Sequence, residues 1–293
     1  MDLTVIINFY NMRREAMRTL ATLSDQYQKG CDHINFEVIA IDHGSSEPLD
    51  ADLVQSFGEN FRYQYVRTDG VSPCHVLNAA VEDATSEYVL ISIDGARMFS
   101  PGVVAECFAA AEHFDHPFVF GLNAHIGPKK QFLLLEEGYT QADEDALLTT
   151  INWREDGYRL FDISCLGRLK AIVDGPNESN IVFMKRADFQ AVGGYNSAFV
   201  SPGGGYASID FFRRSVQTPF IDPVLLIGEA TFHQMHGGAV TGAHGEGRKA
   251  KMMAMKQEYA EITGAPVQNL RYTFDRMGEQ HNHWRQFVAR VEQ

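Results

Sequence analysis

Residues 3–11, LTVIINFYN, form an apolar run that ends in polar residues, and two similar runs follow, FEVIAIDHGSS (36–46) and EYVLISIDGA (87–96). Runs of this kind are typical of parallel strands that are buried on both faces. The segments between them, 13–26 and 74–84, carry apolar residues at helical spacing. This alternation predicts an α/β fold with a doubly wound, mostly parallel sheet.

The rest of the chain continues this pattern less regularly. Residues 123–180 are rich in aromatic side chains and predict an insertion rather than an independent domain. Further strands are expected at 63–66, 118–121, 181–184 and 224–227, and further helices at 51–57, 101–113, 143–150, 187–192, 247–262 and 279–291.

Composition narrows the classes of function. The formal net charge of −13 argues against binding of nucleic acid, which needs clustered Lys and Arg. The N-terminus lacks the flanks of a signal peptide, and no apolar stretch reaches the ~20 residues that cross a bilayer. We therefore expect a cytoplasmic protein. Peripheral membrane contact and the oligomeric state stay open.

Polar residues follow the predicted strands at the point where each ends. In such a sheet these ends face one crevice, where a carboxylate can accept a hydrogen bond from a nucleotide base or a ribose hydroxyl. The alternative is that Asp42 only stabilises its turn and that Asp94-Gly95 is an ordinary turn. The candidates are Asn8, Tyr10 and Asn11; Asp42, Gly44 and Ser45; Asp94, Gly95 and Arg97; and Asn78 on the preceding helix.

Taken together, the three runs resemble the nucleotide-binding half of family 2 inverting glycosyltransferases, whose pattern is P-x-Y-N, then D-D-G-S, then D-x-D. The stretch MKRADFQAVGGYNSAF (184–199) is similar to the family's acceptor side, so the resemblance covers about residues 3–214. It implies a GT-A fold, with a Rossmann-like sheet flanked by helices, an acceptor-side insertion and C-terminal helices. It also implies sugar transfer, with inversion, from a nucleotide-diphosphate sugar to a hydroxyl of a glycan or other acceptor, in glycan or glycoconjugate biosynthesis.

The resemblance also suggests how the chain is divided. Residues 1–122 would form the nucleotide-sugar-binding half, and residues 123–246 the acceptor-side and catalytic half of the same domain. Residues 247–293 would be a C-terminal helical extension. Carried over by position, Asp42 contacts the base and Asp94 contacts the ribose or a metal, within the donor-binding set named above.

Two departures from the family pattern bear on catalysis. The D-x-D motif reads Asp94-Gly95-Ala96, so its second carboxylate is missing. The E-D motif, which supplies the general base, falls near Ala207-Ser208, and only Asp210 remains of its acidic cluster. Either the catalytic groups have moved, or the chain is a catalytically silent binder of nucleotide sugars or glycans.

The segment HQMHGG (233–238) indicates that the groups have moved. It resembles the late loop from which GT-A enzymes supply a metal-binding histidine, so we expect a divalent cation, Mn²⁺ or Mg²⁺, at Asp94 and His236. His233 is either a second ligand or structural. Arg97 either replaces part of the metal's charge beside the diphosphate or is a surface residue.

An inverting transfer needs a carboxylate that takes the proton of the acceptor hydroxyl. Asp210 is the first candidate and Glu178 the second. Asp210 has an alternative role, since it can pair with Arg213 or Arg214 along one helix.

Overall fold

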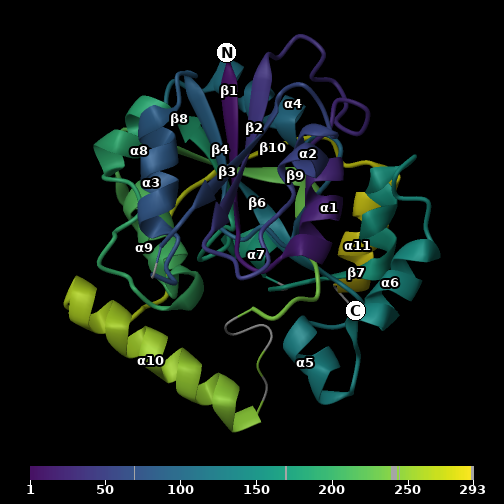
Figure 1. Cartoon of the computed structure of the whole chain (residues 1–293). Helices are drawn as coiled ribbons and strands as arrows, with labels where there is room; N and C mark the ends of the chain where they lie inside the picture. Colours follow the sequence, from purple (N-terminus) through teal and green to yellow (C-terminus); the bar gives the residue numbers. More distant parts are fainter. Residues whose placement is uncertain (69, 169, 239–242, 244, 292–293) are drawn as a thin grey trace.

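The centre of the molecule is one mixed sheet with helices on both faces (Figure 1). The computed structural model describes residues 1–68, 70–168, 170–238, 243 and 245–291. The strands of this described part are β1 Leu3–Phe9, β2 Phe36–His43, β3 Phe61–Val66, β4 Tyr88–Ser92, β5 Arg97–Phe99, β6 Pro117–Ile126, β7 Ser164–Leu166, β8 Ile181–Lys185, β9 Asp222–His233 and β10 Asp275–Met277. The helices are α1 Arg13–Ala21, α2 Ala51–Gln55, α3 Cys74–Asp83, α4 Val103–His113, α5 Gln131–Glu136, α6 Gln141–Thr149, α7 Ala171–Asp174, α8 Arg186–Val192, α9 Ala207–Gln217, α10 Gly245–Thr263 and α11 Asn282–Val291, with 3-10 helices at Gly157–Ile163 and Pro202–Gly204.

The strand order is β10-β9-β6-β8-β4-β1-β2-β3, and β5 and β7 pair with β9 and β6. The strands β3, β2, β1 and β4 run parallel, as do β6, β9 and β10. β8 is antiparallel to both β4 and β6 and joins the two parallel groups. The predicted α/β class with a mostly parallel sheet is confirmed.

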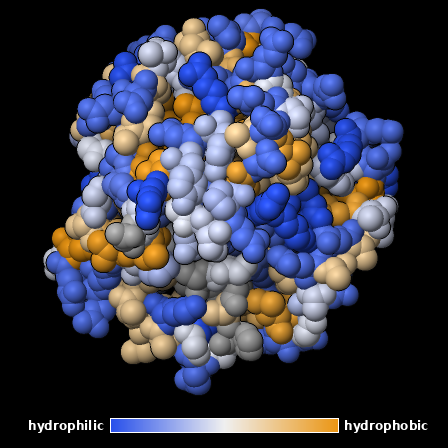
Figure 2. All heavy atoms as spheres, viewed as in Figure 1, coloured by the Kyte–Doolittle hydropathy of each residue, from blue (hydrophilic) through white to orange (hydrophobic). Residues whose placement is uncertain are grey.

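Both faces of the sheet are buried, which explains why its first strand is mostly apolar. Ile6 belongs to the core cluster that contains Leu77 of α3 and Phe211 of α9. Val5 and Ile7 belong to the cluster on the other face, which contains residues of α1 and α4. Burying a side chain of this size stabilises the fold by about 1.5–3 kcal/mol. The face of the molecule shown in Figure 2 is mostly hydrophilic, with hydrophobic residues in scattered groups.

The predicted boundaries between the parts of the chain fall inside regular elements. The boundary at residues 122 and 123 lies within β6, and the boundary at 246 and 247 lies within α10. The two predicted halves therefore share a strand of the same sheet.

β9 is longer than the predicted strand at 224–227, because a bulge interrupts its pairing with β6. Phe120 pairs with Leu225 but Leu122 pairs with Ala230, so residue 121 of β6 lies opposite residues 226–229 of β9. The bulge lets β9 resume beside β6 and carry its pairing as far as His233.

The bulge of β9 also contains a buried acid, Glu229. Glu229 is 3% exposed, and it accepts hydrogen bonds from the Tyr158 hydroxyl (2.8 Å) and from the Gly102 N–H (3.1 Å) at the start of α4. Burial raises the pKa of Glu229 to about 7, although these donors oppose the rise. The folded protein therefore keeps this proton at pH values where the unfolded chain has lost it.

We expect Glu229→Gln to stabilise the protein at pH 8 relative to the wild type, and to change stability less at pH 5. As pH rises from about 4.5 to 7, the unfolded carboxyl ionises first, which destabilises the fold by on the order of 3 kcal/mol. The amide avoids this cost. Urea unfolding at both pH values measures the effect, with the exposed Glu112→Gln as control. An equal effect of Glu229→Gln at the two pH values would contradict the assignment.

Candidate active site

The ends of β1 and β2 are tied together through Asn11. Its backbone N–H donates to Ser45 Oγ (2.8 Å), and its Oδ1 accepts hydrogen bonds from the N–H and hydroxyl of Ser46 (2.9 and 3.0 Å). The φ of Asn11 is +52°, a conformation that Asn adopts more readily than most residues. The two predicted donor-binding loops therefore form one unit.

Asp42 lies at the end of β2 as predicted, but its side chain is fully buried. Its Oδ1 accepts the N–H of Ser45 (3.1 Å), and its Oδ2 accepts the N–H of Leu49 (2.8 Å) and the hydroxyl of Tyr63 (3.5 Å). The expected contact of Asp42 with a base stays a prediction. Asp42 stabilises the turn, which was the alternative interpretation.

Three aromatic rings lie next to Asp42 at this end of the sheet. Tyr10 is 43% exposed, and its ring centroid lies 6.2 Å from that of His43, which lies 5.6 Å from that of His75. Gly44 has a φ of +71°, and a Cβ there would lie 3.1 Å from the Thr68 carbonyl oxygen. A side chain at position 44 would therefore strain the loop.

Gly95 allows the Asp94 turn to pack directly on β1. A Cβ at Gly95 would lie 2.5 Å from the Asn8 carbonyl oxygen and 2.4 Å from the Phe9 ring. The Asn8 amide donates to the Ile93 carbonyl (3.3 Å), while its Oδ1 is buried without a partner among the described residues. The close approach fixes the backbone that carries Asp94.

Both side-chain atoms of Asn78, which was predicted to bind the donor, are engaged within the fold. Its Nδ2 donates to the Tyr195 carbonyl (2.7 Å), and its Oδ1 accepts the Tyr195 N–H (2.9 Å). This pair of hydrogen bonds joins α3 to the G-G-Y segment after α8. Asn78 thus holds two parts of the fold together.

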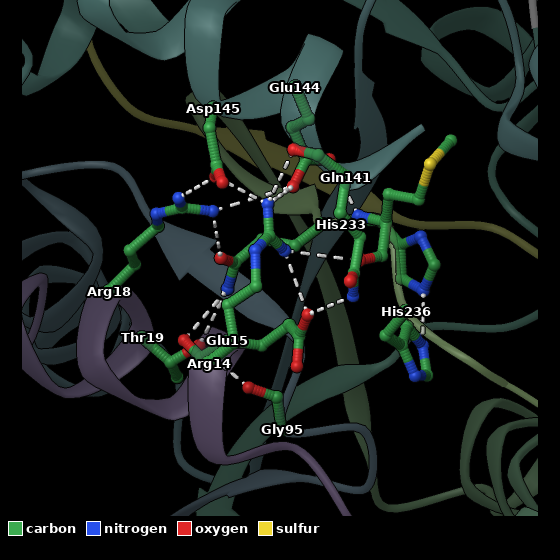
Figure 3. Close-up of polar contacts among 12 residues, drawn as sticks. Arg14, Glu15, Arg18, Thr19, Gly95, Gln141, Glu144, Asp145, His233 and His236 are labelled. Atoms are coloured by element: carbon green, nitrogen blue, oxygen red, sulfur yellow. Dashed lines mark hydrogen bonds and ion pairs between the residues drawn. The ribbon is translucent and has the colours of Figure 1, made fainter. Parts of the chain in front are cut away.

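Asp94, His233 and His236 converge at the end of β9. The Nε2 atoms of the two histidines are 3.1 Å apart, and Asp94 lies 3.2 Å from His233 and 3.8 Å from His236. One ligand atom from each of the three residues lies within 4.8 Å of the others. Figure 3 shows a dashed line that joins the two imidazole rings through their nitrogen atoms. The structure thus groups the predicted ligands Asp94 and His236, and adds His233.

The ionisation states of these groups suit a cation. Burial lowers the pKa of His233 to about 4 despite the neighbouring carboxylate, so its ring is neutral at pH 7. Burial opposes the ionisation of Asp94, but His233, Arg97 and His236 together hold the Asp94 pKa well below its usual range. A carboxylate and neutral imidazole nitrogens are ligands that Mn²⁺ accepts.

Pairing between β5 and β9 places His233 beside the Asp94 turn. Arg97 pairs with His233 in this antiparallel ladder, directly after the Asp94 turn. Neither β5 nor the bulge of β9 was predicted from the sequence. The ligand role of His233 was therefore left open there, although two histidines three residues apart were a signal for it.

Arg97 is buried rather than on the surface. It is 5% exposed, its Nε lies 3.2 Å from Asp94 Oδ2, and its Nη1 has no hydrogen-bond partner among the described residues. A buried guanidinium nitrogen without a partner is costly unless a ligand satisfies it. This favours a phosphate oxygen as the missing acceptor.

Further polar atoms without partners lie on the face of the sheet that carries His233. Asn123 pairs with Thr231 and His125 pairs with His233, so these side chains share one face. Within the described residues, Asn123 Oδ1, His125 Nδ1 and Thr231 Oγ1 are buried and unpartnered. Such a row calls for water or for a hydroxyl-rich ligand. These three residues were not predicted from the sequence.

Glu178 lies near Arg97 and reaches the position of the missing E-D motif. The hydroxyl of Ser208, which occupies that motif, is 3.4 Å from Glu178 Oε2. Burial raises the pKa of Glu178, and the charge of Arg97 and the Ser208 hydroxyl oppose the rise. A raised pKa makes a carboxylate a stronger base.

Asp210, the first candidate for the base, is engaged elsewhere. It is 6% exposed, and its Oδ2 accepts a hydrogen bond from Arg214 Nε (2.9 Å) and lies 2.8 Å from Arg214 Nη2 in an ion pair. Arg214 also donates to the carbonyls of Val192 and Gly194 (2.7 and 2.6 Å). The pair with Arg214 is the alternative role expected for Asp210, and the Arg214 hydrogen bonds tie α9 to the turn after α8. The geometry favours Glu178 over Asp210 as the candidate base.

A carboxylate, two histidines and a buried arginine thus gather at the strand ends of a mixed sheet with the GT-A architecture. The sequence matches the profile of Glycosyl transferase family 2 over residues 4–169, and the chain belongs to this family. Comparison with curated protein sequences gives no match.

Solved structures of S. aureus TarS share the fold. One TarS structure superposes with a TM-score of 0.53 at 13% identity, covering 90% of this chain and 43% of TarS. Residues 1–349 of TarS in complex with UDP give a TM-score of 0.51 at 15% identity, over 100% of this chain and 71% of that one. The complex with UDP-GlcNAc gives 0.51 at 16% identity, over 100% and 72%. This chain thus spans less than half of the longer TarS chain.

A search of the described residues finds no helix with the length and apolar character that a membrane crossing requires.

Proposed function

We propose that this glycosyltransferase moves a sugar from a nucleotide-diphosphate sugar to an acceptor hydroxyl, with inversion at the anomeric carbon. The observation that carries the proposal is the convergence of Asp94, His233 and His236 beside Arg97. Burial lowers the pKa of Arg97, and Glu178 lies close enough for its negative charge to oppose this lowering. A cation site, a fixed cation and a carboxylate are the groups that such a transfer needs.

The nucleotide is assigned to the ends of β1 and β2. Tyr10 offers an exposed ring on which a base can stack, and the joined loops of Asn11 and Ser45 offer backbone and hydroxyl groups to the ribose. The diphosphate then lies towards Arg97, whose buried Nη1 lacks a partner among the described residues. Arg97 donates to a phosphate oxygen and orients the leaving group.

Asp94, His233 and His236 would hold a divalent cation, Mn²⁺ before Mg²⁺ because two of the three ligands are nitrogens. The bound ion would offset the negative charge of the leaving diphosphate. His233 takes the place of the second carboxylate of D-x-D, which is Ala96 here.

Glu178 is proposed as the general base. It takes the proton of the acceptor hydroxyl while that oxygen forms a bond to the anomeric carbon. The bond from this carbon to the diphosphate oxygen breaks on the opposite face, and its electron pair leaves with the diphosphate. Ser208 holds the Glu178 carboxylate in place (3.4 Å).

The sugar is assigned to the unpartnered polar row formed by Asn123, His125 and Thr231. Its hydroxyls would satisfy these atoms, in a reaction of glycan or glycoconjugate biosynthesis. Because TarS was solved with UDP and UDP-GlcNAc, uridine nucleotides are the first to test.

The test is a thermal-shift screen of UDP, GDP, CDP and dTDP with and without Mn²⁺, followed by turnover of the matching nucleotide sugars. We expect one nucleotide to raise the melting temperature, more strongly with Mn²⁺, since ligands that bind the folded state stabilise it. Slow hydrolysis of its sugar conjugate should accompany binding. Binding without hydrolysis or transfer would instead identify a silent binder, and no shift with any nucleotide would overturn the proposal.

A further inference from the structure

The segment between the two histidines is held by side chains from distant parts of the chain. Gln234 donates its backbone N–H to the Ala96 carbonyl (2.8 Å) and its side chain to the Glu15 carbonyl and to Thr19 Oγ1 (both 3.1 Å). The Gln131 amide donates to the His236 carbonyl (3.0 Å). The loop that carries the candidate ligands is thus fixed from several sides.

Met235, at the middle of this segment, has both backbone groups bound to side chains of α1 and α6. Its N–H donates to Glu144 Oε2 at 2.6 Å. Its carbonyl accepts hydrogen bonds from Arg14 Nη1 (3.3 Å) and from the Gln141 amide (3.2 Å). Figure 3 shows these groups between α6 and the two imidazole rings.

Glu144 is the buried centre of this arrangement, at 1% exposed. Its Oε1 is paired with Arg14 (3.2 Å) and Arg18 (3.5 Å), so its Oε2 is left for Met235. A capping box between Thr140 and Asp143 begins α6 and sets the direction of its first turn. Glu144 directly follows Asp143 in this turn. The helix therefore delivers Glu144 in a defined place.

Asp145 is the natural comparison for Glu144. It pairs with the same two arginines, with Arg14 at 2.5 Å and with Arg18. Its side chain is 46% exposed, and among the described residues it makes no hydrogen bond to positions 233–236. The two adjacent acids thus share their cationic partners and differ in their contact with Met235.

We propose that Glu144 is a positioning residue for the cation site: through the Met235 N–H it sets the separation of His233 and His236. The inference rests on the proposed function and deepens it, since it gives the segment 123–180, expected to serve the acceptor, a role on the donor side. A peptide N–H midway between two ligands is an effective point of control, because shifts there move both rings. Outer partners of metal ligands commonly change metal affinity by about 10–100-fold.

The test distinguishes the length of the side chain at position 144 from its charge. Glu144→Asp keeps the charge and its arginine partners but withdraws the carboxylate by one methylene from the Met235 N–H. Glu144→Gln keeps an oxygen within reach of that N–H and removes the charge. We expect Glu144→Asp to weaken Mn²⁺ binding by about 10-fold or more, and Glu144→Gln and the control Asp145→Asn to weaken it less than about 3-fold. Electron paramagnetic resonance titration of Mn²⁺, alone and with UDP, measures the affinity.

Thermal unfolding of each variant shows that the comparison is between folded proteins. Affinity that follows charge, with Glu144→Gln weak and Glu144→Asp normal, would overturn the inference, as would equal affinity in all variants. If the wild-type protein binds no Mn²⁺ with or without UDP, the proposed cation site itself fails and the inference fails with it.

Discussion

Glu178→Gln is expected to lower turnover by about 10²–10⁴-fold, the usual effect of removing a positioned general base. The change keeps the size of the side chain and an acceptor for the Ser208 hydroxyl, so the fold and the nucleotide affinity should stay near those of the wild type. The amide cannot take the acceptor proton. Steady-state kinetics with the donor identified by the nucleotide screen measures the loss, which should fall on kcat.

Two control variants make this result specific. Ser208→Ala removes one hydrogen bond to Glu178 and should cost less than about 10-fold, the range of a single hydrogen bond. Asp210→Asn weakens the pair with Arg214. It should lower the melting temperature and leave turnover close to that of the wild type. If folded Asp210→Asn is inactive and Glu178→Gln is active, the base is Asp210.

The pH dependence of kcat/KM provides an independent test of Glu178 as the general base. Because burial raises the pKa of Glu178 above 4.5, kcat/KM should fall as pH decreases through a value above 4.5.

Asp94→Asn and His233→Ala are each expected to weaken Mn²⁺-dependent nucleotide binding by about 100-fold, at least as much as the loss of an outer partner of a metal ligand. Asn keeps the Oδ1 that accepts the Ala96 N–H (3.1 Å), so the turn should survive. Calorimetry of the identified nucleotide with Mn²⁺, and with EDTA, measures the effect.

His116→Ala is the matched control for the histidine change, since His116 pairs with Asp188 away from the site (3.0 Å). It should bind Mn²⁺ and nucleotide like the wild type. Full transfer activity in EDTA would contradict the cation site and leave Arg97 as the group that neutralises the diphosphate.

The fold could be predicted from the sequence because its strongest signals are local. The apolar runs at 3–9, 36–41 and 88–93 need only burial on both faces to become strands, and the structure has them as β1, β2 and β4. The short strands β5, β7 and β10 were not predicted, since three residues carry too little pattern. They form because longer neighbours offer them hydrogen-bonding edges.

The site could be predicted only where it depends on strand ends. Asp94 and His236 were expected to meet, and they do. Asp42 and Asn78 were placed in the donor site, but each is engaged by backbone groups that only the folded chain brings near. Glu178 and Ser208 are separated by thirty positions, and Glu144 and Met235 by ninety-one, so no spacing in the sequence indicates either contact.

Ala96 lies where the Asp94 turn contacts the segment that carries His233 and His236. It is fully buried, and its carbonyl accepts the N–H of Gln234, within the segment that presents both histidines. Restoring the family's aspartate there would place an unpaired charge in the interior and push on that segment. Position 96 of this fold therefore favours a small, uncharged side chain.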